Sequence, residues 1–409
     1  MTIAVTITLC ALLLLAYVFD LSAARTRIPT VILLLALGWL VRQATTFFQI
    51  PIPNLDPILP ALGTVGLILI VLEGSLELEL NRARFRLVAK ASLMALLPML
   101  LLCAGIAALF ILQSGAGWQP ALANAIPLAV ISSAIAIPTA RYLRRDQREF
   151  ITYESSLSDI YGVILFNFIT LNHYFGAETF GVFLLEMLLM LVISFLATAG
   201  LSFLMSRSNH KVKFIPIMII LILIYSLSKI WHLPALVFIL LFGLFLGNLD
   251  QMVGWKFIQR LRPERLEHEV HRFAEITAEV TFLIRSLFFL LFGFLIETHE
   301  LLNPDSLVAA ITVTAGIFLT RYLSLLVLRV PSWPVLFIAP RGLITILLFL
   351  SVPVSLQLEV ANRSLIIQVI VLCALVMMFG MMAARPERPG DQLPRPEDQS
   401  PLSVRQPSN

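Results

Sequence analysis

Long apolar runs, repeated along the whole chain, set the strongest limit on its fold. Hydrophobic residues make up 59% of the 409 residues, and charged residues only 13%. A helix of about 20 apolar residues crosses the hydrocarbon core of a bilayer, and it satisfies all its own backbone groups there. The sequence predicts an all-α polytopic membrane protein with thirteen spans. The expected spans are 2–19, 28–43, 60–80, 87–112, 121–140, 152–172, 180–205, 213–230, 234–248, 274–297, 304–328, 333–356 and 362–384.

The basic residues test this count through the positive-inside rule. Of the 29 Lys and Arg residues, 23 fall in the loops of one face and in the C-terminal tail. The loops of the other face hold Arg42, Lys229 and Arg363, and the spans hold Arg285, Arg321 and Arg341. We therefore expect an N-terminus outside and a C-terminus in the cytoplasm. The expected location is the inner membrane of a bacterial cell.

Several other classes of function lack their sequence signatures. The three cysteines show neither metal-ligand spacing nor a disulfide framework, so no cofactor is expected. A Walker-type phosphate loop is missing, which argues against an ATPase. The arginines lie between spans and form no basic patch, so no nucleic-acid partner is expected. The tail, 385–409, is rich in proline and charged residues, which is typical of a disordered segment.

One span carries two carboxylates, Glu154 and Asp159, inside its apolar run. A charged carboxylate at bilayer depth is costly, so an intramembrane acid is a candidate functional residue. At about 100° per residue, Ser155, Asp159 and Gly162 share one helix face, and Ser158 lies beside it. Glu154 lies about 140° away from Asp159 on the same helix. We expect the two acids to have different partners.

Two spans carry helix-breaking residues at a similar depth. In 121–140, the serine pair 132–133 lies between Pro127 and Pro138, and in 333–356 the sequence reads P-R-G-L at 340–343. At about 1.5 Å per residue, both points lie about 13 Å from the cytoplasmic ends of their spans. Proline removes a backbone donor and glycine loosens a helix.

Two interrupted helices at matched depth, in opposite halves and opposite orientations, are typical of secondary transporters with inverted repeats. The span 180–205 then links two six-span halves. The alternative interpretation is that Pro and Gly only bend two packed helices.

Asp159 is the candidate ion-binding acid. A carboxyl group removed from water holds a proton more readily than in solution, so one site can hold either a proton or a cation near neutral pH. Alkali cations prefer oxygen ligands, here the Asp159 carboxylate, freed carbonyls and the hydroxyls of Ser132, Ser155 and Ser158. The expected transient ligand is Na⁺. The alternative is an acid satisfied by a neighbouring Arg or hydroxyl, with no role in transport.

Four other charged residues in the spans require an explanation. Arg341 needs an anion, and Glu154 is the best candidate for a structural ion pair. Arg285 is expected to modulate the charge of a cavity or to hold lipid, or else its side chain snorkels to the cytoplasmic face. Snorkelling is the favoured interpretation for Arg321. Glu73 lies in the inner third of its span, where it either lines a cytoplasmic funnel or marks the membrane border.

Four segments, taken together and in this order, resemble the sodium/proton exchanger branch of the monovalent cation/proton antiporter superfamily. They are G-L-I-L-I-V-L-E-G-S-L-E-L at 66–78, E-S-S-L-S-D at 154–159, L-I-R-S-L-F-F at 283–289 and P-R-G-L at 340–343. The resemblance implies a homodimer, in which a core domain of crossed, broken helices moves like an elevator. It implies that Asp159 is the ion-binding acid and that Glu154 and Arg341 form a stabilising pair.

The resemblance also implies a division of the chain into domains. The dimerisation half-domains are 1–86 and 213–300, the core half-domains are 87–173 and 301–384, the linker is 174–212, and the tail is 385–409.

Two positions depart from the family pattern. Its Thr-Asp-Pro in the first broken helix corresponds here to Ser132-Ser133-Ala134, and the Asn before the key Asp is Ser158. Ser133 supplies a hydroxyl and main-chain oxygens in place of the acid. We expect an antiporter that exchanges Na⁺ for H⁺ at Asp159 without net charge transfer. The alternatives are exchange of K⁺ or another solute, and a transport-inactive relative that acts as a membrane sensor or interaction protein.

Overall fold

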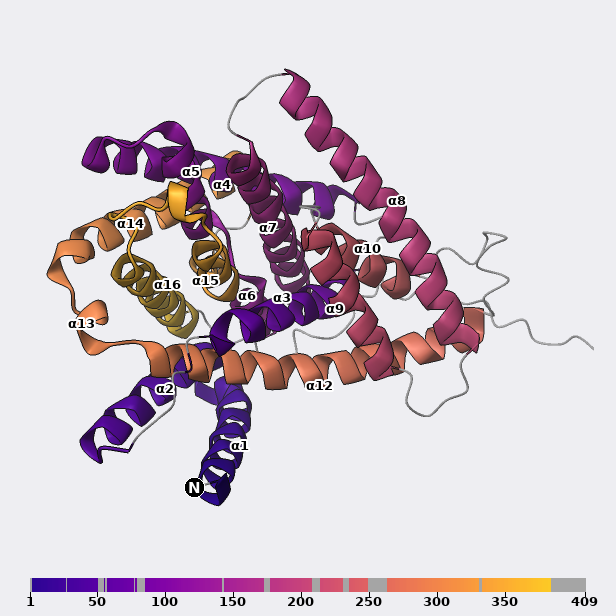
Figure 1. The fold of residues 1–409 in the computed structure, drawn as a ribbon, viewed down its shortest axis with the longest axis horizontal. Coiled ribbons are helices and arrows are strands. Elements are labelled where there is room, and N and C mark those ends of the chain that lie inside the picture. The colour runs from indigo at the N-terminus through magenta and orange to yellow at the C-terminus, as the bar shows by residue number, and fades with distance from the viewer. Residues whose placement is uncertain are drawn as a thin grey trace, which may run out of the picture.

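The computed structural model is built from helices (Figure 1). It describes residues 2–26, 28–50, 55, 57–76, 78, 85–141, 143–172, 177–207, 214–230, 235–248, 263–330 and 333–383. No strand occurs among these residues. The tail at 385–409, for which disorder is expected, lies outside them.

The helices follow one another along the chain as the apolar runs predict. They are α1 (Thr2–Thr26), α2 (Thr30–Phe47), α3 (Ile58–Leu76), α4 (Phe85–Ser114), α5 (Trp118–Ala129), α6 (Ser133–Ala140), α7 (Arg145–Leu171), α8 (Ala177–Arg207), α9 (Phe214–Ile230), α10 (Ala235–Gly247), α12 (Pro263–Leu295), α13 (Thr298–Leu301), α14 (Pro304–Val327), α15 (Leu343–Leu350) and α16 (Arg363–Ala383). Two short 3₁₀ turns, η3 (Val335–Phe337) and η4 (Val354–Leu356), flank α15.

Seven helical segments of the described chain are long and apolar enough to cross a membrane, with α5 and α6 taken as one segment. They are α2, α3, α4, α5 with α6, α12, α14 and α16. Shorter apolar stretches lie in α1, α8, α9 and α10. The count of thirteen membrane crossings stays a prediction.

One group of helices is arranged around α12, which packs along α2 and α3 (Figure 1). The helix α10 packs on α3, α8 and α9. Glycines bring α2 and α12 together, because a Cβ atom at Gly38 would lie 2.2 Å from the Leu290 oxygen, and one at Gly293 would lie 2.4 Å from the Leu35 oxygen. Small residues at such contacts let helix backbones approach closely in membrane proteins.

A second group consists of α4 to α7 and α14 to α16. The helix α4 packs on α5, α7 and α14, and α14 packs on α16. The start of α14 is fixed locally, since the Asn303 side chain accepts the Asp305 N–H at 3.0 Å and Pro304 occupies the first helical position. The helix α3 also packs on α6, α7 and α15, so it lies at the boundary between the two groups.

The first expected helix interruption is confirmed. α5 ends at Ala129, Val130 and Ser132 have extended backbone angles, and α6 begins at Ser133. Pro127 lies within the last turn of α5, and it lacks the N–H that an uninterrupted helix would use there.

The second expected interruption is also present, and it is more extensive than a single kink. The 3₁₀ turn η3 is followed by non-helical residues 338–342, and α15 begins directly after Gly342. The Ser132 N–H donates to the Pro340 carbonyl at 2.9 Å. The two interruptions therefore touch through their backbones.

Candidate functional site

Two backbone donors freed at the first interruption find partners on other elements. In a continuous helix, the Ile131 and Ser132 N–H groups would bond to carbonyls one turn earlier. The Ile131 N–H instead donates to the Ser158 hydroxyl of α7 at 3.0 Å, and the Ser132 N–H donates to Pro340. Buried backbone groups require such partners. The interruption is therefore held open by α7 and by the second interruption.

Arg341 satisfies two of the carbonyls that the same interruption leaves free. Its Nε donates to the Leu128 oxygen at 2.6 Å, and its Nη2 donates to the Ala129 oxygen at 3.3 Å. Its Nη1 donates to the Ala339 oxygen at 3.0 Å. A cation at these carbonyls complements the negative end of α5. Arg341 thus joins the last turn of α5 to the residues of the second interruption.

The expected ion pair between Glu154 and Arg341 is wrong. Glu154 pairs with Arg321 of α14, with Nη1 to Oε1 at 2.6 Å and Nη2 to Oε2 at 2.9 Å. Both side chains are buried, at 1% and 2% exposure. Arg321 therefore does not snorkel. The physical reason is that the carbonyls at the end of α5 already occupy Arg341, while Arg321 offers Glu154 a two-pronged contact.

Arg321 performs the structural role that the sequence assigned to Arg341. Its Nε and Nη2 also donate to the Val335 oxygen of η3, at 3.2 and 3.0 Å. The Glu154–Arg321 pair therefore ties the segment before the second interruption to α7.

Asp159 lies in the middle of α7 with 1% of its surface exposed. Its Oδ2 accepts a hydrogen bond from the Ser133 hydroxyl. Ser133 is the first residue of α6, and the N-terminus of a helix favours an anion. Asp159 forms no ion pair with any residue that the structure describes. The prediction that Glu154 and Asp159 have different partners is confirmed.

Two buried oxygens of this cluster lack partners within the described residues: Asp159 Oδ1 and Ser132 Oγ. Ser155 lies one turn before Asp159, and its hydroxyl donates to the Ile151 oxygen at 2.8 Å, which leaves its oxygen lone pairs free to accept. Buried polar atoms without partners are rare in folded proteins. The unpaired oxygens can be satisfied by a cation, a water molecule or a proton on the carboxyl group.

Gly162, on the Asp159 face, lets α7 approach the first interruption closely. A Cβ atom at Gly162 would lie 2.2 Å from Val130 Cγ2. Any larger residue must displace Val130, which is fully buried. The position of Asp159 relative to Ser133 therefore depends on this glycine.

The two expected modulatory residues lie apart from the hydrogen-bonded cluster around Asp159. Glu73 pairs with Arg141 at 3.6 Å, and its side chain is 12% exposed. Arg285 is buried beside a small cavity between α1, α2, α6 and α12. Sequence reasoning missed Arg321 and Arg141 as partners of the acids.

A family model matches most of the chain. The sequence matches a family model described as "Sodium/hydrogen exchanger, transmembrane" over residues 10–385. No curated protein matches the sequence. The structure is similar to that of the sodium proton antiporter MjNhaP1 from Methanocaldococcus jannaschii at pH 8, with a TM-score of 0.63 and 17% identity over 93% of this chain and 96% of that chain. An electron-microscopy map of the same antiporter gives the same values. At this level of sequence identity, the similarity shows a shared fold and nothing more.

Proposed function

Because this chain belongs to the sodium/hydrogen exchanger family, we propose that it exchanges Na⁺ for H⁺ across the membrane at Asp159. Members of this family are integral membrane transporters and not enzymes, and they exchange a cation for protons. The proposal concerns three points: which cation is exchanged, which residue binds it, and how many ions and protons are exchanged.

One observation carries the proposal: Asp159 Oδ1 and Ser132 Oγ are buried and have no partner among the described residues. They belong to neighbouring elements, and Ser133 connects those elements by its hydrogen bond to Asp159. Carboxylate and hydroxyl oxygens are the ligands that hard cations prefer. A proton on Asp159 would satisfy the same carboxylate by removing its charge. One site can therefore hold a cation and a proton in turn.

The proposed stoichiometry follows from the charges around the site. Glu154 and Arg321 neutralise each other, and Ser133 carries no charge. Asp159 is thus the single carboxylate without a cationic partner in the described site. If one Na⁺ replaces one H⁺ there, the exchange moves no net charge.

The proposed motion is a movement of one group of helices against the other. The group that contains the two interruptions also contains α4, α7, α14 and α16. The other group contains α1, α2, α8, α9, α10 and α12. At the boundary, α3 packs on α10 and α12 of this other group. Exposing Asp159 alternately to each side requires one group to move against the other. We propose that the group with the interruptions is the moving core and that the other forms the dimer contact.

Proton flux in proteoliposomes tests the proposed exchange. Na⁺, Li⁺ or K⁺ is added outside vesicles with an imposed pH gradient, and dissipation of the gradient is followed with a fluorescent dye. We expect Na⁺ to dissipate it faster than K⁺. Absence of flux with all three ions, from protein shown to be folded, would contradict the proposal and favour the transport-inactive alternative.

A clamped membrane potential tests the stoichiometry separately. Electroneutral exchange predicts equal Na⁺-driven flux at zero potential and at a potential imposed by a potassium gradient with valinomycin. A flux that depends on the sign of the potential would show that net charge moves, and would require a second ion or proton site.

A further inference from the structure

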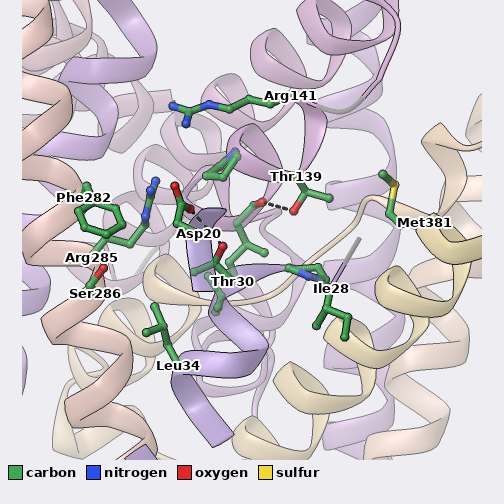
Figure 2. Close-up of a pocket in the computed structure, with 14 residues that line it drawn as sticks. Asp20, Ile28, Thr30, Leu34, Thr139, Arg141, Phe282, Arg285, Ser286 and Met381 are labelled. Carbon is green, nitrogen blue, oxygen red and sulfur yellow. Dashed lines mark hydrogen bonds between the residues drawn. The ribbon is translucent and has the colours of Figure 1, made fainter. Parts of the chain in front are cut away.

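A cavity of about 680 Å³ lies where α6 ends and α7 begins. This volume is within the range of about 300–1,000 Å³ that is typical of sites for small organic ligands. The cavity beside Arg285 measures only about 30 Å³, which is room for a water molecule or two. Figure 2 shows Arg141 among the residues that line this smaller cavity, and Arg141 also lines the larger one. Of these two cavities, the larger one can hold an organic ligand.

The charges that line the larger cavity are mostly positive. Among the described residues of its lining, three are arginines and one is an acid. Arg141 directly follows α6, and Arg145 and Arg148 lie at the start of α7. Residues three apart on a helix are neighbours on its surface. The acid is Glu149, whose Oε1 accepts from the Nε of Arg145 at 3.0 Å. The excess of positive charge favours an anion in this cavity.

The present contacts of the three arginines leave them able to bind an added anion. Arg148 forms no ion pair with any residue that the structure describes. The bridge from Arg141 to Glu73 is long, at 3.6 Å. The Arg145 side chain is 71% exposed, so its pair with Glu149 is a weak surface pair. An anion can therefore bind Arg148 without displacing an acid, and it can bind the other two arginines at little cost.

The remaining walls of the cavity strengthen its attraction for an anion. Leu76, Leu78 and Ile137 line it, and apolar walls of low dielectric focus the field of nearby charges. The first turn of α7 has no side-chain cap, so its N–H groups also favour an anion. Asp146, the acid of that turn, is not among the residues of the lining.

The chemistry of the walls indicates which anion fits. The planar guanidinium group of arginine matches the oxygens of a phosphate group, and it binds them through two parallel hydrogen bonds. The apolar walls can cover an uncharged part of the same molecule, and the volume allows for one. The cavity therefore suits an organic anion that carries phosphate.

The walls of this cavity come from both groups of helices. Ile137 lies on α6 and Arg148 on α7, in the group with the interruptions. Leu76 is the last residue of α3, at the boundary, and Gly247 is the last residue of α10, in the other group. Movement of one group against the other must therefore change the cavity. A ligand that binds one arrangement better shifts the protein toward that arrangement.

We propose that this cavity binds a phosphate-bearing organic anion through Arg141, Arg145 and Arg148, and that the bound anion slows exchange by holding the two groups in the arrangement described here. The phosphate comes either from a soluble organic phosphate or from the headgroup of an anionic phospholipid. The effect on exchange rests on the proposed function, whereas the binding does not.

Calorimetric titration of the purified protein in neutral detergent tests the binding. The soluble probes are ADP and pyrophosphate. The lipid probe is short-chain phosphatidylglycerol, with short-chain phosphatidylcholine, which has no net charge, as its control. We expect Arg148→Gln to weaken binding about tenfold or more, because a charge-assisted hydrogen bond is lost. The matched control is Arg144→Gln, an exposed arginine beside α7 that is not among the residues of the lining, and it should change the affinity little.

The probes distinguish the two sources of phosphate. Binding of ADP or pyrophosphate would identify a soluble ligand, and binding of phosphatidylglycerol alone would identify a lipid headgroup. Absence of binding by all three would overturn the site. Equal losses of affinity in Arg148→Gln and Arg144→Gln would also overturn it, because they would show a diffuse attraction to the basic surface. Thermal unfolding of both variants checks that they fold as wild type does.

Na⁺-driven proton flux in proteoliposomes, with and without the probe that binds, tests the effect on exchange. We expect the bound probe to reduce flux in wild type, and to reduce it much less in Arg148→Gln at the same concentration. Binding in the absence of any cation-driven flux would support the site and contradict the antiporter. Flux that the bound probe leaves unchanged would support the antiporter and overturn the proposed effect of the anion.

Discussion

Ser133 donates a hydrogen bond from its hydroxyl to Asp159. This donor favours the charged carboxylate over the protonated one. The hydroxyl therefore weakens the hold of Asp159 on a proton, and it does so without adding charge to the site. At the scale of single residues, Ser133 is the group that balances proton against cation in the proposed exchange.

The variant Ser133→Ala tests this balance. Without the hydroxyl, the ionised carboxylate loses a donor, so Asp159 should retain its proton to a higher pH. A hydrogen bond to a charged group contributes about 1.5–3 kcal/mol, and we expect the profile of Na⁺-driven flux against pH to move about one to two pH units in the alkaline direction. The control is Ser226→Ala on α9, an exposed serine that bonds only within its own helix. An acid shift would contradict the account.

The Glu154–Arg321 pair makes a prediction about stability. Arg321→Gln leaves a buried carboxylate without its cation, and we expect the free energy of unfolding to fall by about 3–5 kcal/mol. Adding Glu154→Gln removes the stranded charge and should recover much of the loss. Thermal unfolding in detergent measures both effects, with the exposed Arg272→Gln as the control.

The variant Arg341→Gln distinguishes the Glu154–Arg321 pair from the pair of Glu154 and Arg341 that the sequence predicted. Arg341 bonds to carbonyls and not to Glu154, so Glu154→Gln should not rescue it. Rescue of Arg341→Gln, or failure to rescue Arg321→Gln, would contradict the partners described here.

At the scale of elements, the position of Asp159 depends on the contact between α7 and the first interruption. Gly162→Ala places a methyl group where Val130 now lies. Overpacking of this kind costs typically about 1–3 kcal/mol, and here it also pushes Ser132 and Ser133 away from α7. We expect a lower melting temperature and a several-fold loss of Na⁺-driven flux.

A second substitution provides the control for Gly162→Ala. Val130→Ala makes room for the methyl group, so the double variant should recover part of both losses. Gly105→Ala on α4 is the matched single control, because nothing lies within 4 Å of a Cβ atom there. A harmless Gly162→Ala would contradict the importance of this contact.

The interruptions could be predicted from the sequence, but the partners of the charged residues could not. Pro and Gly act on their own backbone, so Pro127 and P-R-G-L at 340–343 mark the interruptions directly. The partner of an arginine depends on which helices are neighbours, which spacing along one helix does not reveal. Depth does not decide between the two arginines either, because Arg321 and Arg341 lie seven and eight residues, or roughly 11 and 12 Å, from the cytoplasmic ends of their expected spans.

At the scale of the whole molecule, the acids divide between two tasks. The pair of Glu154 and Arg321 lies within one group of helices, where it can stay intact through the cycle. The bridge of Glu73 and Arg141 joins α3 to the residue after α6, across the boundary that the proposed motion crosses. Apolar runs predict the helices on either side, but the side-chain contacts across this boundary depend on tertiary packing.

The central claim is that Asp159 carries both the cation and the proton. The most direct test compares Na⁺-driven proton flux in proteoliposomes for wild type, Asp159→Asn and Asp146→Asn. Asp146 makes a matched control, because it is an exposed acid in the first turn of the same helix. The account predicts that flux vanishes in Asp159→Asn and persists in Asp146→Asn. Flux that survives Asp159→Asn in correctly folded protein would contradict it.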